Sequence, residues 1–354
     1  MYVYVINMVL IYFENLITKV KNGGKSYKKL FCFLVSMQFV LISGLRAITI
    51  GADTPVYEEL FVYYHSITWK EMLDYFIAMF TQSGTYESRD MAYYLFTKIF
   101  STIVPSYRAF LFFVIIVFMA GFTKFIYKYS ADCCLSYLIF ASFMFAFFGL
   151  TGIRQTFAVI LCVFIGFELI KERRFLPFLI TVLVACMVHK TSIIFLPFYF
   201  VYNIRITKLY KVMVFIMFGT VFLLKNKLAI FLTNGTYSIY AERLGQGPYN
   251  LLLFITMIVF MGLLLYEKLN QRNKMVNVYI NAVVIGMFIL ELSLSIPILV
   301  RLSYYFIIFI VLLIPEIFQI IDIRGRRILM PVFSVALCLL MTKSGTPPYQ
   351  FMWQ

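Results

Sequence analysis

Charged residues are scarce in this sequence. They make up only 13% of its 354 residues, whereas soluble domains carry roughly 25%. Hydrophobic residues make up 62% and aromatic residues 19%, which is more apolar side chain than one compact core can hide from water. A soluble globular protein, a disordered chain and a disulfide-rich secreted domain are therefore excluded. Most of the chain must face lipid.

Motifs for metals and nucleotides are also missing. The sequence contains no CxxC pair, Walker loop, GxGxxG, HExxH or Asp-rich loop. The six cysteines lie mostly in apolar runs, where we expect buried thiols without disulfides. We therefore expect no metal, no cofactor and no ATP-driven mechanism. The net charge of +15 does not indicate nucleic acid, because Lys and Arg fall in short clusters between apolar runs.

Nearly charge-free runs mark the expected membrane spans. Since a span needs about 20 apolar residues, we predict an all-α polytopic membrane protein with about 12 transmembrane helices, within a range of roughly 10 to 14. The expected runs are 2–18, 29–50, 107–127, 134–150, 153–170, 175–188, 191–204, 210–225, 250–266, 276–296, 302–320 and 327–343. The stretch 175–204 is treated as two spans that meet at His189.

The basic clusters predict the orientation. Every second connection is rich in Lys and Arg, as the positive-inside rule requires of cytoplasmic loops. This pattern places both termini outside and predicts a single transmembrane domain over 1–354. The inner clusters are those around Lys19 to Lys29, Lys124 and Lys128, Lys171 to Arg174, Arg205 to Lys211, Lys268 to Lys274 and Arg324 to Arg327.

Two connections on the expected outer side are long, 51–106 and 226–249. The first contains two amphipathic stretches, 69–80 and 90–104, which are too polar to cross a membrane. We expect these stretches to lie on the outer surface or to re-enter the bilayer.

Charged side chains at the ends of apolar runs are costly and usually functional. Arg154 follows a glycine-containing break where a helix is expected to begin, and Arg301 follows Pro297 in the same way. An Arg in such a place supplies a bidentate clamp for phosphate. Either Arg alone could equally extend to the interface, but two such positions on one expected face favour an anion site.

Two further residues are candidates for proton transfer. His189 lies between two apolar runs beside Lys190, and it is either a general base, a donor to a phosphate or sugar hydroxyl, or a structural residue. Asp53 precedes Thr54 and Pro55, so it either marks a helix start or orients and deprotonates an acceptor hydroxyl. Spacing alone does not decide which of the two is the base.

Several of these segments form an ordered set with a known counterpart. They are 46–57 with Arg46, Asp53 and Tyr57, 152–158 with Arg154 and Gln155, 185–192 with His189 and Lys190, Arg301 with Tyr304, Tyr305 and Phe306, and the tail at Pro348 and Tyr349. In order and spacing this set resembles the EpsG-like family of Wzy-type polysaccharide polymerases. One departure lies at 87–90, so the resemblance assigns no role to Asp90.

The resemblance implies a metal-independent membrane glycosyltransferase. Such proteins join undecaprenyl-diphosphate-linked oligosaccharide repeat units into O-antigen, capsule or exopolysaccharide at the outer face of the bacterial cytoplasmic membrane. The implied partners are these lipid-linked oligosaccharides, the lipid bilayer and a chain-length regulator, and no nucleic acid. The implied catalytic residues are His189, Asp53 and Arg154, and the implied substrate-binding residues are Arg46, Tyr57, Gln155, Lys190, Arg301 and Tyr304.

Two other classes of protein stay open. A transporter that flips lipid-linked oligosaccharide suits a dozen helices and a basic cavity, but it predicts pseudo-symmetry between the halves of the chain. The segments around Arg154 and His189 have no counterparts in the second half. A polytopic O-acyltransferase ranks last, because its catalytic His would have to meet a cytoplasmic acyl donor.

Overall fold

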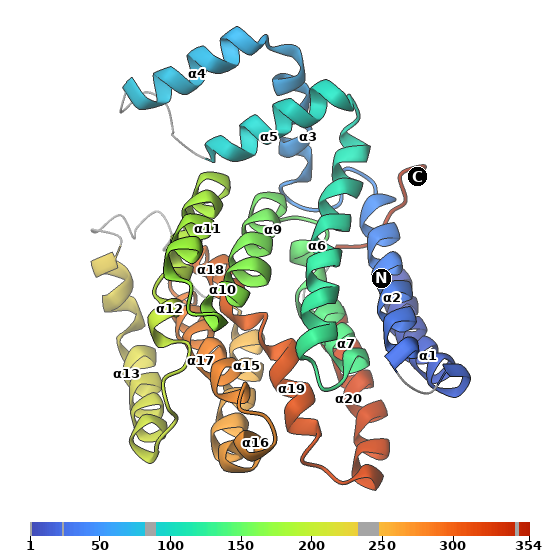
Figure 1. Cartoon of the computed structure of the whole chain (residues 1–354), viewed down its shortest axis with the longest axis vertical. Helices are drawn as coiled ribbons and strands as arrows, with labels where there is room; N and C mark the ends of the chain where they lie inside the picture. The colour runs from blue at the N-terminus through green and yellow to red at the C-terminus, as the bar shows by residue number, and fades with distance from the viewer. Residues whose placement is uncertain (1, 23–24, 82–89, 233–247, 344–346) are drawn as a thin grey trace. The chain divides into compact units, whose positions relative to one another are not determined.

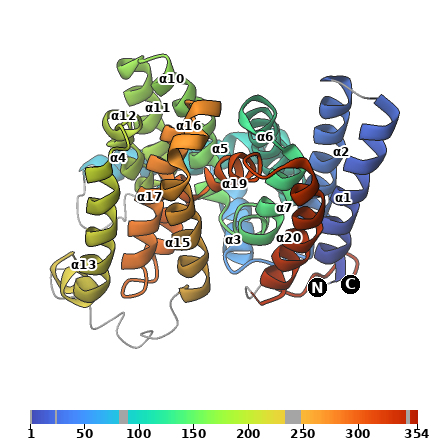
Figure 2. The same cartoon turned by 90° about the horizontal axis from the view of Figure 1, so that it is seen from below.

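The computed structural model of the chain describes residues 2–22, 25–81, 90–232, 248–343 and 347–354. These residues are built into helices (Figures 1 and 2), and the β-structure among them is one isolated bridge between Arg46 and Phe351. The all-helical fold expected from the apolar runs is thereby confirmed. The chain divides into two compact units, Met1–Leu196 with Leu329–Gln354, and Pro197–Ile328.

The first unit contains the N-terminal helices and most of the last helix. Within it, α2 packs along both α1 and α6, and α11 packs against α9 and the segment η1. Its elements are α1 (Tyr2–Asn22), α2 (Lys25–Gly44), α3 (Thr54–Ser66), α4 (Trp69–Thr81), α5 (Met91–Ile103), α6 (Tyr107–Tyr129), α7 (Cys133–Phe143), α8 (Phe145–Phe148), α9 (Ile153–Val159), the π-helix η1 (Ile160–Gly166), α10 (Phe167–Lys171), α11 (Phe175–Val188), the 3₁₀-helix η2 (Lys190–Phe195) and α20 (Ile323–Lys343).

The second unit is centred on α17, which packs against α13, α15 and α18. A helix that is apolar on all sides is expected to be buried, and α17 is buried along most of its length. The side-chain amides of Asn277 and Asn281 donate to the carbonyl of Ile204, at 3.0 and 2.8 Å, and so tie α17 to the chain before α13. The elements are α12 (Phe198–Val201), α13 (Lys208–Leu232), α15 (Tyr249–Leu264), α16 (Tyr266–Arg272), α17 (Val276–Leu292), α18 (Leu299–Ile307) and α19 (Ile310–Phe318).

Each expected span coincides with an apolar helix or a bent pair of helices. In the described residues, 5 helices are long and apolar enough to cross a membrane, or up to 7 if each bent pair is one span. The remaining expected spans correspond to shorter apolar helices, such as Tyr2–Thr18 and Val276–Leu292. The expected split at His189 is also present, since α11 ends at Val188 and η2 begins at Lys190. The protein is a polytopic membrane protein.

Basic residues gather at one end of the first unit. Lys128 at the end of α6 pairs with Glu168 at 2.7 Å, and the hydroxyl of Tyr129 donates to the same carboxylate at 2.7 Å. Lys171 in turn donates to the Tyr129 hydroxyl at 2.7 Å. A third expected inner cluster joins them through Lys28, which donates to the neighbouring Tyr127 carbonyl at 2.8 Å. Three clusters that the sequence placed on one side therefore meet.

The opposite end of α6 lies beside the end of α2. Nη1 of Arg108 donates to the carbonyl of Gly44 at 3.0 Å. Arg108 and Lys128 are separated by nearly the whole of α6, which is ~30 Å at 1.5 Å per residue. The segment between α2 and α6 therefore leaves the helix bundle and returns to it at the same end.

That segment forms a small helical layer with an aromatic core. The expected amphipathic stretches are α4 and α5, each 13 residues long, or ~20 Å, which is too short for a span. Tyr64 of α3 and Tyr94 of α5 stack with their ring centroids 5.0 Å apart. The buried residues of this core are Tyr57, Phe61, Tyr64, Met72, Tyr93, Tyr94, Tyr107, Phe110, Leu111, Val114 and Ile153.

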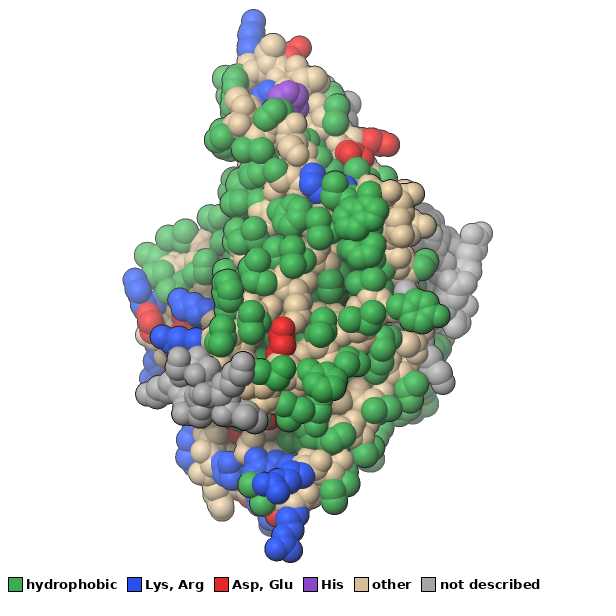
Figure 3. All heavy atoms as spheres, turned by 90° about the vertical axis from the view of Figure 1, so that its right-hand side faces the viewer, with side chains coloured by type: hydrophobic (Ala, Val, Ile, Leu, Met, Phe, Trp, Pro, Cys, Tyr) green, Lys and Arg blue, Asp and Glu red, His purple; other side chains and the backbone are tan. Residues whose placement is uncertain are grey.

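The outer surface of the helices is apolar. Figure 3 shows the face on the right-hand side of Figure 1, where α1 and α2 lie, and hydrophobic side chains cover most of its middle while Lys and Arg lie toward its margins. Exposed side chains on these helices include Phe13, Ile17 and Phe33. This distribution is the one expected of a surface in contact with lipid.

Candidate functional site

The chain breaks between α8 and α9, and side chains from distant segments satisfy the carbonyl groups there. The hydroxyl of Ser43 donates to the Gly149 carbonyl at 2.5 Å. The Leu150 carbonyl accepts from the hydroxyl of Thr54 at 2.9 Å and from Nη2 of Arg46 at 3.3 Å. Because buried carbonyl groups need donors, these contacts fix the shape of the break.

Arg46 is 1% exposed and its side chain contacts this break. Its Nη1 donates to the carbonyl of Ser43 and, at 2.9 Å, to the Ser43 hydroxyl. In this structure the guanidinium of Arg46 supports the backbone, and its contact with a substrate stays a prediction. Gly51 makes the close approach possible, since its φ is +100° and an added Cβ would meet the Leu150 carbonyl oxygen at 2.0 Å.

Arg154 follows the break, in the first turn of α9. Its Nη1 lies 2.5 Å from Oδ2 of Asp90, the residue just before α5. Its Nε donates to the hydroxyl of Tyr57 at 3.2 Å, and its guanidinium carbon lies 5.3 Å from the centre of the Tyr57 ring. The Arg154 side chain remains 25% exposed, whereas that of Asp90 is 5% exposed. The guanidinium is therefore held in place but is still reachable.

The second break, at His189, contacts the same carboxylate. The backbone N–H of Lys190 donates to Oδ1 of Asp90 at 3.3 Å. Nδ1 of His189 lies 3.7 Å from Oδ2 of Asp90, within ion-pair distance but too far for a hydrogen bond. The Ser192 hydroxyl fixes the turn by donating to the His189 carbonyl at 2.7 Å. Two breaks in the helical chain therefore bring Arg154, His189 and the Lys190 N–H around Asp90.

Asp90 is charged in this setting. Its burial acts to raise the pKa of the carboxyl, but the His189 ring, the Arg154 guanidinium and the Lys190 N–H outweigh that effect and hold the pKa below its ordinary value. A carboxylate that stays ionised near neutral pH is the correct partner for the fixed positive charge of Arg154.

A comparison with protein families matches residues 29–351 to the EpsG family. The chain belongs to the EpsG family. The match reaches into both units and covers every segment that carried the resemblance in the sequence. Membership identifies a membrane protein of polysaccharide biosynthesis. A search of curated proteins and a search of solved structures found no match.

The structure of this EpsG-family protein places the remaining sequence-predicted residues as follows. Asp53 is half-buried at the start of α3, four residues before Tyr57. Gln155 is 2% exposed within α9, directly after Arg154. Arg301 and Tyr304 lie on α18 in the second unit.

Sequence reasoning passed over Asp90. The residue directly precedes the amphipathic helix α5, and its side chain contacts segments that are distant in the chain, which no local pattern reveals. The only available signal was an acidic residue at the end of a segment that departs from the family pattern. The part of the chain that the structure describes contains no group of three His, Cys, Asp or Glu side chains able to hold a metal ion.

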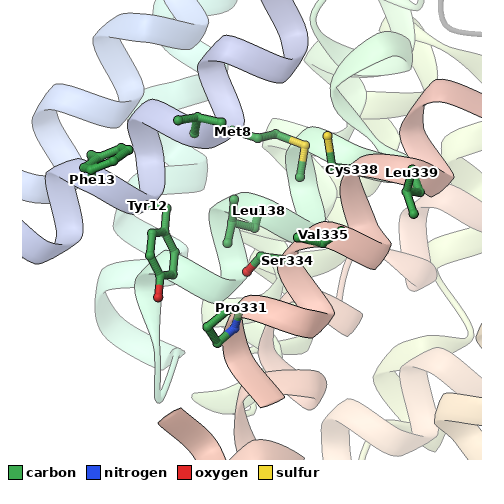
Figure 4. Close-up of a pocket in the computed structure, with 10 residues that line it drawn as sticks. Met8, Tyr12, Phe13, Leu138, Pro331, Ser334, Val335, Cys338 and Leu339 are labelled. Carbon is green, nitrogen blue, oxygen red and sulfur yellow. The ribbon is translucent and has the colours of Figure 1, made fainter. Parts of the chain in front are cut away.

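A pocket of the EpsG-family protein has a different chemistry from the cluster around Asp90. A pocket of about 310 Å³ lies between α1, α7 and α20 (Figure 4). Its lining is almost entirely apolar, with Met8, Leu138, Val335 and Leu339 among the residues that form it. The lining contains no charged side chain, so the pocket suits a hydrocarbon rather than a sugar or an anion.

Proposed function

We propose that this EpsG-family protein is a glycosyltransferase that polymerises oligosaccharide repeat units carried on undecaprenyl diphosphate. The observation that carries the proposal is the convergence of the Arg154 guanidinium, the Lys190 N–H and the His189 ring on one buried carboxylate. Guanidinium groups, backbone N–H groups and imidazoles are donors with which proteins hold phosphate. Family membership supports the polysaccharide class of the product.

In the proposed reaction, Arg154 binds the diphosphate of the donor, which is the growing glycan on its lipid carrier. A hydroxyl of the incoming repeat unit attacks the anomeric carbon of the donor. A new C–O bond to the acceptor forms, and the bond between the anomeric carbon and the diphosphate oxygen breaks. The lipid diphosphate leaves with the electron pair, and the positive charge of Arg154 stabilises the charge that develops on it.

The acceptor hydroxyl must lose its proton in this step, and His189 is the proposed base. Nδ1 of His189 faces the Asp90 carboxylate, so the proton-accepting nitrogen in the proposal is Nε2. An anion beside one nitrogen of an imidazole orients the ring. Asp53, at the start of α3, remains the second candidate for this role.

The proposed location is the bacterial cytoplasmic membrane, with the site on the outer face and both termini outside. Arg154 and Lys171 lie at opposite ends of one candidate span, Ile153–Lys171. The end with Lys171 also carries Lys28 and Lys128. Because Lys and Arg favour the cytoplasmic side, this arrangement supports an outward orientation for Arg154, where lipid-linked repeat units would be polymerised.

A complementation experiment tests the proposal. A strain that lacks the gene is supplied with the wild-type chain or with Arg154→Ala at equal expression, and the surface glycan is resolved by length. The proposal predicts long chains with wild type and single repeat units on the outer face with the variant. Repeat units that stay on the cytoplasmic side in the deletion strain would instead indicate a flippase.

A further inference from the structure

Asp90 stands at the N-terminus of α5 but does not cap it. An Asp in this position normally accepts a hydrogen bond from a backbone N–H in the first turn, and the Asp90 side chain makes no such bond. Only its main-chain carbonyl serves the helix, by accepting from the N–H groups of Tyr93 and Tyr94 at 3.0 and 3.2 Å. The Asp90 side chain therefore does not stabilise the start of α5 by capping.

The backbone of Asp90 is also unusual. Its φ is 59° and its ψ is 43°, in the left-handed region that residues other than glycine rarely adopt. Residues held in such conformations concentrate at functional sites, where surrounding contacts maintain them. Here those contacts are the pairing of the carboxylate with Arg154 and with the Lys190 N–H.

The donors around the Asp90 carboxylate are of the kinds that bind a phosphoryl group. The carboxylate meets a guanidinium at 2.5 Å and a backbone N–H at 3.3 Å, with an imidazole 3.7 Å away. Nε of Arg154 is already engaged by the Tyr57 hydroxyl. An incoming anion therefore cannot reach Nη1 of Arg154 and the Lys190 N–H together unless Asp90 moves away.

We propose that the Asp90 carboxylate competes with the substrate for the anion-binding site formed by Arg154 and the Lys190 N–H. The diphosphate of a lipid substrate displaces this carboxylate when it binds. The identity of that lipid rests on the function proposed above, whereas the competition rests on the contacts around Asp90. The ligand chemistry is a diphosphate at the end of an apolar chain. The phosphoryl oxygens take over the donors that Asp90 gives up, and the backbone of Asp90 is released from its left-handed conformation.

Displacement has a measurable consequence for affinity. When the anion-binding site is free of Asp90 in only a fraction of the molecules, the apparent dissociation constant for the ligand exceeds the intrinsic one by the inverse of that fraction. Replacing the carboxylate with an amide removes the competing charge and raises the free fraction. Asp90→Asn is therefore expected to bind a diphosphate at least ~10-fold more tightly than the wild type.

The test is a binding measurement without turnover. The full chain in lipid nanodiscs is titrated with farnesyl diphosphate by calorimetry, with farnesol and inorganic pyrophosphate as parallel probes. The variants are Asp90→Asn, Asp90→Glu and Arg154→Gln, and the matched control is Asp74→Asn, which makes the same change at an exposed position on α4. The expected order of affinity is Asp90→Asn above wild type, Asp74→Asn and Asp90→Glu equal to wild type, and Arg154→Gln weakest.

Several outcomes overturn the proposal. These are unchanged or weaker binding in Asp90→Asn, an equal gain in Asp74→Asn, undiminished binding in Arg154→Gln, or equal binding of farnesol. If Asp90→Asn does not fold, Asp90→Ala gives the same comparison. If Asp90→Asn gains as much affinity for pyrophosphate as for farnesyl diphosphate, the anion-binding site recognises diphosphate itself. If it gains affinity for farnesyl diphosphate alone, the site recognises the lipid form. Both results support the competition.

The binding result and the proposed function can fail separately. If Asp90→Asn gains affinity but the wild-type chain forms no polymer from lipid-linked repeat units, the competition stands and the polymerase assignment fails. If polymer forms and depends on Arg154, but Asp90→Asn shows no gain, the polymerase assignment stands and the competition fails.

Discussion

Nη1 of Arg154 lies 2.5 Å from Oδ2 of Asp90, although 64 residues separate the two in the chain. The pair joins the start of α5, in the short helical layer between α2 and α6, to the start of α9, which begins a candidate span. His189 and the Lys190 N–H approach the same carboxylate from a second break. The site therefore depends on the contact of three segments.

Replacing Arg46 should destabilise the protein before it affects chemistry. Arg46→Ala removes the guanidinium donor of the buried Ser43 carbonyl and one of the two side-chain donors of the Leu150 carbonyl, and a buried group left unpaired costs about 1–3 kcal/mol. We expect a clear loss of thermal stability in detergent, measured by the melting temperature. Arg174→Ala is the control, because Arg174 is exposed and pairs with the equally exposed Glu172; equal melting temperatures in the two variants would refute the role given to Arg46.

Asp90 should contribute to stability in a pH-dependent manner. Because its pKa is lowered in the folded protein, its contribution is present above the unfolded-state pKa of about 3.9 and is lost as pH falls through the lower folded value. We expect wild type to be more stable than Asp90→Asn from pH 5 to 8, by about 3 kcal/mol or less since Arg154 is partly solvated. The advantage should shrink below pH ~4. Melting curves across this range check it, and an advantage that grows on acidification would contradict the assignment.

His189 should control the rate of polymerisation if it accepts the acceptor proton. His189→Ala is expected to lower the rate by roughly 10²–10⁴-fold while the diphosphate still binds. The pH profile of wild-type activity is measured between about pH 5 and 8 and compared with that of His189→Gln. The two profiles should differ in shape. An unchanged pH profile in His189→Gln would move the role of base to Asp53.

The orientation in the membrane is open to direct measurement. Reporter fusions at Lys25, Lys171, Arg205 and Arg324 should report the cytoplasm, and fusions at Tyr64 and Gly235 should report the outside. Gly235 lies outside the described residues, but its side of the membrane follows from the basic clusters. A cytoplasmic signal at Tyr64 would invert the topology and place the Asp90 cluster on the wrong side for polymerisation.

The positions of the helices could largely be predicted from the sequence, because apolar runs and basic clusters are local patterns. The breaks at 149–152 and at His189 were also visible, since glycine residues and a polar residue interrupt apolar runs there. The number of full-length spans could not be predicted, because several runs fold as short or bent helices whose length depends on packing. Helix length in such cases is a tertiary property.

The organisation of the site could be predicted only in part. Arg154 and His189 were chosen because charges at the ends of apolar runs are costly, and the structure brings these two residues together. Asp90 could not be chosen in the same way, because it does not end an apolar run and its contacts are with distant segments. The role of Arg46 could not be predicted either, because a buried Arg that binds backbone carbonyls looks the same in the sequence as one that binds a substrate.

The most direct test of the polymerase assignment uses purified protein. The wild-type chain and Arg154→Gln, reconstituted in lipid, are given a defined undecaprenyl-diphosphate-linked repeat unit, and both glycan length and released lipid diphosphate are measured. We predict that the wild type forms multimers and releases one lipid diphosphate per bond, and that Arg154→Gln is slower by ~10²–10³-fold. Multimers formed at the wild-type rate by Arg154→Gln, or no multimers from a folded wild-type protein, would contradict the account.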